Sequence, residues 1–373
     1  AQQAIAERKI IEGQKAGHAC GHHLFGTGST AAAIAVKDWL KKGNKTGTIK
    51  LMGCPAEEGG SGKVYMVREG IFKDSEAVLH WHPSDRNNAN PMSSLANISG
   101  KFRFAGIAAH AAGAPERGRS ALDGVEAMNN MVNMMREHVP QDTRIHYVIT
   151  KGGEAPNVVP AFAEVYYYAR HPNRDVLKDV WQRINNAAKG AALGTGTKVD
   201  LEVTGGAYDL LPIESLARVM HKNMEIVGGI KYASEEIAFA EKLIPTLPTT
   251  TNGVLSYTKA GEVTPFSPLL EPLGGSTDVG DVSWAAPTGG LTAATWVPGT
   301  PMHSWQAVAA GGMSLGPKGM MVAAKTLALT AIDLFKDPQL IKAAQSDWQK
   351  GRGENFKYEA MVGDRKPALD YRK

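Results

Sequence analysis

Two metal-binding residue types stand close together near the start of the chain. Residues 17–23 read GHACGHH, in which Cys20 and His22 are separated by one glycine. A glycine-rich turn lets both side chains converge, so that a thiolate and an imidazole can bind one cation. The alternative is a loop that carries a buried cysteine and exposed histidines. The segment alone leaves both interpretations open.

A pair of adjacent carboxylates, Glu57 and Glu58, follows in CPAEEGG, between a predicted strand and a predicted helix. Ligand and catalytic groups collect at the carboxyl ends of parallel strands. Two neighbouring side chains there point in different directions, so one could bind a metal ion while the other faces a water molecule. Taken alone, such a pair is more typical of a solvated acidic turn.

Histidines complete the pattern. The next predicted strand ends in LHWHP, and alternation places His80 and His82 on the same side of it. His303, in GTPMHSW, is the only histidine in the last third of the sequence. Together these segments supply cysteine, histidine and glutamate at successive strand ends, a combination that suits a pair of borderline transition-metal ions.

Other catalytic templates fit poorly. The zinc motif HExxH is absent. Residues 59–63 (GGSGK) resemble a phosphate-binding loop, but Glu57 occupies the position of its first glycine and Val64 that of its serine or threonine. Residues 312–316 (GMSLG) match a nucleophile elbow. That fold needs a histidine after the serine, and none follows His303. We therefore reject both.

The composition is that of an ordinary globular protein. Of the 373 residues, 43% are hydrophobic and 21% charged, and the net charge of +4 is spread without a lysine and arginine stripe, which argues against nucleic-acid binding. No run of eighteen apolar residues predicts a membrane span. Two cysteines exclude a disulfide scaffold at this length. We see no signal peptide and expect a cytoplasmic protein.

The elements that must position these residues alternate in the first third of the chain. We predict helices over residues 29–42 and 63–69 and strands over residues 48–53 and 77–82. Helices alternating with strands predict an α/β fold with a mostly parallel sheet.

From residue 97 the order changes to strand 98–105, helix 120–138, strands 144–150 and 163–170, helix 175–192 and strand 198–204. This βαββαβ order is typical of a ferredoxin-like α+β module. We therefore predict a catalytic domain formed by residues 1–96 and 208–373, with an inserted lid domain of residues 97–207. Residues 246–272, rich in Thr, Pro and Gly, are predicted to form a long loop near the site.

Six segments together resemble one known family. GHACGHH, GCPAEEGGSGK, VLHWHP, AAHAAGAPERGRSALDGVEAM, GGEAPNVVPAFAEVYYYAR and GTPMHSWQ are similar to the metal-dependent aminoacylase and carboxypeptidase G family. Within it, they most resemble the branch of p-aminobenzoyl-glutamate hydrolases and indole-acetyl-amino-acid hydrolases. The similarity covers almost the whole chain, in the expected order.

The resemblance implies a function and a set of roles. Such enzymes use two divalent ions, zinc or manganese, to hydrolyse the amide bond of an N-acyl or N-aroyl amino acid, and they form homodimers through the lid domain. The implied general base is Glu57. The residue that would contact substrate in the partner's site is His110, and the implied grip on the substrate carboxylate is formed by Asn157 and Arg170. The implied metal ligands are Cys20, His22, Glu58, His82 and His303.

Two departures from the family pattern stand out. The residue after the second ligand is usually Asp or Asn in the family, and here it is His23. Family members also carry a longer segment before GHACGH, including a strand with an Asp that orients a ligand. Two other functions therefore stay open: a metal-binding but inactive regulatory or binding subunit of the same fold, and a thiol hydrolase that uses Cys20.

Overall fold

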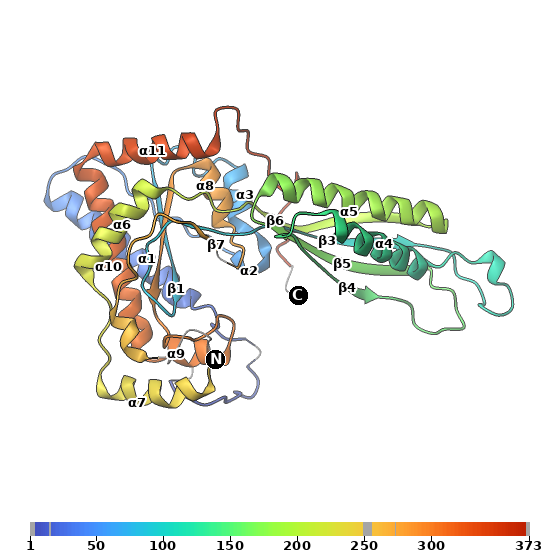
Figure 1. Cartoon of the computed structure of the whole chain (residues 1–373), viewed down its shortest axis with the longest axis horizontal. Coiled ribbons are helices and arrows are strands. Elements are labelled where there is room, and N and C mark those ends of the chain that lie inside the picture. Colours follow the sequence, from blue (N-terminus) through green and yellow to red (C-terminus); the bar gives the residue numbers. More distant parts are fainter. Residues whose placement is uncertain (1–3, 15, 249–255, 273, 371–373) are drawn as a thin grey trace.

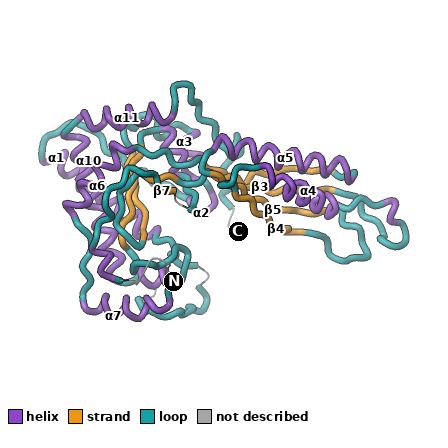
Figure 2. Tube along the Cα trace, viewed as in Figure 1, coloured by secondary structure: helices purple, strands orange, loops and turns teal. Residues whose placement is uncertain are grey.

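We describe the protein from a computed structural model, which covers residues 4–14, 16–248, 256–272 and 274–370. Two units lie side by side (Figure 1): a larger one that contains the N-terminal end of the described chain, and an elongated four-stranded unit of β3 to β6, residues 96–207, with the C-terminal segment beside β6. The helices of the larger unit surround two short strand pairs (Figure 2).

The larger unit is formed by segments on either side of the four-stranded unit. Its strands are β1 (Val78–Ser84), β2 (Met92–Ser93), β7 (Glu271–Pro272) and β8 (Thr288–Ala294). Its helices are α1 (His22–Lys42), α2 (Glu57–Gly60), α3 (Gly62–Arg68), α6 (Glu214–Val227), α7 (Ser234–Leu243), α8 (Val279–Ala285), α9 (Trp305–Gly311), α10 (Leu315–Lys336) and α11 (Pro338–Arg352).

Parallel pairing in the larger unit confirms the predicted α/β class. Strand β1 pairs with β8 in parallel, from Val78 opposite Thr288 to Ser84 opposite Ala294, and β2 pairs with β7 in parallel. Helices α1, α6 and α10 pack against β1 and β8. The buried side chains of Trp81 and Leu291 meet those of Val36 and Met220 there, which fixes the strand end that carries His82.

The strand predicted over residues 48–53 does not form. These residues are neither helix nor strand, and Ile49 and Leu51 are exposed. A strand is stable only when its backbone groups find a partner, and no described strand pairs with this segment. The glutamates therefore follow an extended loop. Of the loop predicted over residues 246–272, residues 249–255 lie outside the described part.

The four-stranded unit has the ferredoxin-like order that the sequence predicts. It runs β3 (Ala96–Ala105), α4 (Ala121–Met135), β4 (Arg144–Lys151), β5 (Phe162–His171), α5 (Arg174–Thr195) and β6 (Lys198–Ala207). The antiparallel strands are arranged β4-β5-β3-β6. Both helices cover the same face, where alternate strand residues such as Val165 and Tyr167 are fully buried.

Side-chain caps begin both helices of the four-stranded unit, and its first and last strands connect it to the larger unit. Asn173 caps α5 by accepting hydrogen bonds from two backbone N–H groups, and Ser120 caps α4 in the same way with one. The entering strand β3 and the leaving strand β6 pair with each other, with Asn97 opposite Ala207. The chain therefore enters and leaves the unit at one end, beside the larger unit, and the opposite end extends away from it (Figure 1).

No helix among the described residues combines the length and the apolar character that crossing a membrane requires.

Candidate active site

The structure brings the predicted metal ligands together. Three overlapping groups of side chains could each bind a metal ion. Within each group, the ligand atoms all lie within 4.8 Å of one another. Their members are Cys20, His22 and His82; Cys20, Glu58 and His303; and His22, Glu57 and Glu58. The implied ligands and the implied base therefore form one cluster, drawn from segments nearly 300 residues apart in the sequence.

Glycine positions the first two predicted ligands. Gly21 lies between Cys20 and His22 in the left-handed region, with φ 76°, and a Cβ atom there would lie 2.7 Å from the Cβ atom of Pro83. Only glycine fits both constraints. The turn lets Cys20 precede α1 while His22 occupies its first position.

The two glutamates lie in a strained turn. Ala56 and Ser61, on either side of α2, both have positive φ angles, 60° and 52°. A Cβ atom on Gly62 would lie 1.9 Å from the carbonyl oxygen of Pro55, so the chain needs glycine where it leaves this turn. Non-glycine residues with positive φ cost free energy, and they persist where the surrounding fold holds them in place. Here the strained turn places Glu57 and Glu58 beside His22.

The remaining two predicted ligands, His82 and His303, come from strand β1 and the loop before α9. His82 Nδ1 donates a hydrogen bond to the carbonyl oxygen of Pro83 at 2.7 Å, and its Nε2 lies 3.5 Å from Cys20 Sγ. His303 has φ 60°, and its Nε2 lies 3.3 Å from Glu58 Oε1. The bond to Pro83 fixes the tautomer of His82, so that Nε2 presents its lone pair to the cluster.

The cluster fits a metal site on its own geometry. His22 Nε2 is buried without a hydrogen-bond partner in the described residues, 4.0 Å from Glu57 Oε2 and 3.9 Å from Glu58 Oε1. Burial lowers the pKa of His22, and it lowers that of His82 to about 4, so both imidazoles are neutral. Ligands that each lie about 2.0–2.2 Å from one zinc ion are separated by distances of this order.

His80 does not join this cluster. It belongs to none of the three ligand groups, and burial lowers its pKa to about 3. A Cβ atom on Gly290 would lie 2.2 Å from His80 Nε2, so the ring fills the space above the neighbouring strand. It is therefore a packed neighbour of the site.

His110 and Asn157 lie at the far end of the four-stranded unit. The Ala111 N–H donates to the Asn157 carbonyl at 3.0 Å, and His110 forms an isolated bridge with Val158. His110 Nδ1 accepts hydrogen bonds from the N–H groups of Ala112 and Gly113, and its ring is exposed. Its Nε2 is thus left as the N–H that can contact another molecule.

Arg170 lies at the opposite end of the same unit. It precedes the last residue of β5 and pairs in register with Asn97, next to the larger unit. The eight steps along β5 from Phe162 to Arg170 span about 26 Å. One chain therefore does not bring Asn157 and Arg170 together, and a shared substrate would need them from two chains.

Arg170 lines a cavity of about 850 Å³. It is lined by Leu95, Asp142, Arg144, His146, Tyr168, Arg170, Pro172 and Gly274. Three residues after Gly274, the Thr277 side chain hydrogen-bonds to Glu57. A short segment of the chain therefore connects the cavity wall to Glu57, and two arginines against one aspartate give the cavity a net positive charge.

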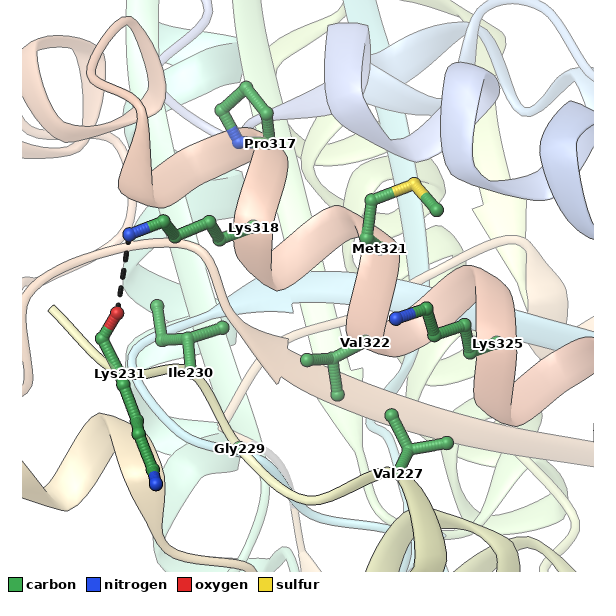
Figure 3. Close-up of a pocket in the computed structure, with 9 residues that line it drawn as sticks. All are labelled: Val227, Gly229, Ile230, Lys231, Pro317, Lys318, Met321, Val322 and Lys325. Carbon is green, nitrogen blue, oxygen red and sulfur yellow. Dashed lines mark hydrogen bonds between the residues drawn. The ribbon is translucent and has the colours of Figure 1, made fainter. Parts of the chain in front are cut away.

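A second, smaller cavity of about 480 Å³ lies elsewhere in the larger unit, between α10 and the segment after α6 (Figure 3). Lysine and aliphatic side chains line it, and Lys318 Nζ donates to the carbonyl oxygen of Lys231 at 3.2 Å. None of the implied substrate-contacting residues lines this smaller cavity, whereas Arg170 lines the larger one, so we assign substrate binding to the larger cavity.

Comparisons with known proteins agree with this geometry. Residues 95–195 match the peptidase dimerisation domain. The chain is 40% identical over 370 residues to one of the subunits of p-aminobenzoyl-glutamate hydrolase of Escherichia coli K12, covering 94% of this chain and 77% of that protein. The chain belongs to the M20 peptidase family, on the p-aminobenzoyl-glutamate hydrolase branch.

Solved structures show the same M20 fold. An aminobenzoyl-glutamate utilization protein from Klebsiella pneumoniae superimposes with a TM-score of 0.58 and 21% identity, over 82% of this chain and 67% of that one. A dinuclear metal-binding M20 peptidase from Bacillus subtilis superimposes with a TM-score of 0.53 and 14% identity, over 86% and 73%. These structures show the fold; the 40% identity to the E. coli hydrolase subunit and the matched dimerisation domain show a hydrolase that acts on an amide bond.

The electrostatics of this M20 site argue against a nucleophilic thiol. Burial raises the pKa of Cys20 to about 12, and the carboxylates of Glu58 and Glu57 add to that effect. Reactive thiols have the opposite surroundings, in which nearby cations lower the pKa. A thiolate at Cys20 needs a bound cation beside it, which fits a ligand and not a free nucleophile.

A buried ion pair that the sequence analysis missed supports the glutamate turn. Lys63 Nζ lies 2.7 Å from Asp278 Oδ1, and the Lys63 backbone N–H donates to Asp278 Oδ2 at 2.9 Å. Both side chains are buried, with exposed fractions of 7% and 2%. The pair ties the start of α3 to the segment that carries Thr277. No local pattern indicates it, apart from the lysine in GSGK.

This ion pair yields a stability prediction. We expect Asp278→Ala to lower the free energy of unfolding by about 3–5 kcal/mol, because the Lys63 ammonium stays buried without its partner. Glu214→Ala, which breaks the exposed pair between Glu214 and Arg218 on α6, serves as the control and should cost less than about 1 kcal/mol. Urea unfolding measures both values. Equal small losses would show that Asp278 contributes no more than a surface charge.

Proposed function

We propose that the chain hydrolyses the amide bond of an N-acyl or N-aroyl amino acid, of the p-aminobenzoyl-glutamate kind, and releases the acid and the free amino acid. The observation that carries this proposal is the convergence of the five proposed metal ligands beside Glu57. The E. coli relative, named for p-aminobenzoyl-glutamate hydrolysis, supports the substrate class.

The ligand set proposed for two divalent ions is Cys20, His22, Glu58, His82 and His303. When bound, such ions would lower the pKa of a water molecule and polarise the scissile carbonyl. Neutral imidazoles and a thiolate suit zinc, and the carboxylate also suits manganese. The chain contributes the geometry: His82 is fixed by its bond to Pro83, and Cys20 and His22 are held by the turn at Gly21.

Glu57 is the proposed general base. Burial raises the pKa of its carboxyl, and the Asp278 carboxylate raises it further, whereas Lys63 and the Thr277 hydroxyl lower it. A base whose pKa is moved toward the working pH can accept the water proton and later donate it to the leaving amine. Glu57 is adjacent to the ligand Glu58, so it lies within reach of a water molecule at the cluster.

The four-stranded unit is the proposed lid and dimerisation domain, residues 97–207. Strand β4 is an edge of its sheet, and Val148 and Ile149 on that strand are exposed. An exposed apolar edge favours pairing with another chain. A second copy of this chain would then bring His110 and Asn157 into the site that contains Arg170. The E. coli relative is named as a subunit, so a different chain of the same fold is the alternative partner.

Arg170 tests the substrate class. As the proposed clamp for the substrate carboxylate, it should contribute a charge-assisted contact worth about 2–4 kcal/mol in a closed site. We expect Arg170→Ala to lower kcat/KM for a free-acid substrate about a hundredfold, since each tenfold corresponds to about 1.4 kcal/mol. Steady-state kinetics on p-aminobenzoyl-glutamate measures this loss.

The control is the matching substrate whose α-carboxylate is converted to an amide. Arg170→Ala should change kcat/KM for this substrate less than about threefold, because it has no α-carboxylate to lose. Equal losses on the acid and the amide would mean that Arg170 supports the fold or the dimer and does not recognise the carboxylate.

A further inference from the structure

Two arginines face each other on the sheet surface that lines the larger cavity. Arg144 on β4 stands directly opposite Arg170 on β5 in the antiparallel register. Side chains in such a pair have Cβ atoms about 4.5–5.5 Å apart, and like charges placed there destabilise the sheet. A negatively charged group is needed to offset the repulsion between these two positive charges.

Neither guanidinium has a carboxylate partner in the described part of the chain. Arg144 donates to the backbone carbonyls of Gln141 and Thr143, at 2.9 and 3.1 Å. Arg170 lies over the ring of Tyr168, 5.8 Å from its centroid. Asp142 lines the same cavity but forms no ion pair with either arginine.

Two further polar side chains share this surface. His146 lies opposite Tyr168 in the β4–β5 register, two residues along from the arginine pair. All four residues point away from α4 and α5, because the alternate positions Ile145 and Ala169 are buried in the core under those helices. The surface therefore offers two guanidinium cations and two further hydrogen-bonding side chains to one ligand.

We propose that this surface makes the enzyme selective for dicarboxylic amino acids, with Arg170 binding the α-carboxylate and Arg144 the side-chain carboxylate of glutamate or aspartate. The inference rests on the proposed function and adds Arg144 as a specificity-determining residue. Two carboxylates neutralise the two guanidiniums, and guanidinium is the cation best suited to planar, bidentate pairing with a carboxylate. His146 and Tyr168 lie beside them as further polar partners.

The test uses the metal-loaded full chain and two substrates, p-aminobenzoyl-glutamate and p-aminobenzoyl-glutamine, which differ by one side-chain charge. We expect the wild type to favour the glutamate by about thirtyfold in kcat/KM, the usual effect of one charge-assisted contact. Arg144→Gln should remove most of that preference by lowering kcat/KM for the glutamate alone. Arg144→Lys should keep part of it.

The matched control is Lys189→Gln, which removes one positive charge from α5 on the opposite face of the sheet and should leave the preference unchanged. Equal wild-type rates on both substrates, or an equal loss on both in Arg144→Gln, would overturn the inference while leaving the proposed function intact. If the wild type hydrolyses neither substrate, the proposed function fails and the inference fails with it.

Discussion

Replacing Glu57 with glutamine should lower kcat by about a thousandfold, within the range of general acid–base catalysis. The amide keeps the size of the side chain and its place in the strained turn, but it cannot accept the water proton. The hydroxyl of Thr277 can still donate to the remaining carbonyl oxygen of residue 57. We therefore expect the metal content and the thermal unfolding temperature of this variant to stay close to those of the wild type.

Glu58→Gln is the matched comparison for Glu57→Gln. Glu58 contacts both His22 and His303, at 3.9 and 3.3 Å, and is a proposed ligand. Its replacement should lower both metal content and turnover, because a neutral amide is a weaker ligand than a carboxylate. Metal analysis and kinetics on the two purified variants separate the roles. Near-native turnover in Glu57→Gln would mean that the roles of the two glutamates are exchanged.

Removal of bound metal should abolish activity completely. We expect dialysis against EDTA to reduce hydrolysis to background, and added zinc or manganese to restore it, because the proposed ligands would hold the ions needed to activate the water molecule. The metal-free protein should also unfold at a lower temperature, since an ion that binds only the folded state stabilises it. Activity assays and thermal unfolding before and after metal addition measure both effects.

The same experiment separates the metal mechanism from a thiol mechanism. If metal-free protein kept full activity and alkylation of Cys20 abolished it, Cys20 would be a nucleophile and the metal proposal would fall. The surroundings of Cys20 predict the opposite, because burial and two carboxylates keep its thiol protonated in the absence of a cation. Comparing recovery with zinc and with manganese also addresses which metal the site prefers.

The ligand cluster could be predicted because its residues lie in short, dense segments at the ends of elements. Cys20 and His22 are one glycine apart, and His82 lies near the end of β1, next to the buried Trp81. The ferredoxin-like unit could also be predicted, because the hydrophobic periodicity of its strands and helices is visible within each short segment. The strand predicted over residues 48–53 was wrong because a strand depends on a partner, which a local pattern does not reveal.

The features that could not be predicted from the sequence depend on pairings between residues far apart in the chain. Lys63 and Asp278 meet across 215 positions, and neither residue type is expected in a buried core. Arg144 and Arg170 become neighbours only through the register of β4 and β5. The same register, extended along the strand, places Asn157 and Arg170 at opposite ends of the unit, so that their shared role needs a second chain.

The central claim is that the chain hydrolyses acyl-amino-acid amide bonds, and one measurement tests it most directly. The metal-loaded wild type is incubated with a panel of N-acyl and N-aroyl amino acids, and the products are detected by mass spectrometry. The Glu57→Gln variant is run in parallel. We predict release of the free acid and the free amino acid by the wild type, with p-aminobenzoyl-glutamate among the substrates cleaved, and almost none by the variant. A wild type that binds metal but releases no product from any member of the panel would contradict this account and favour an inactive binding subunit of the same fold.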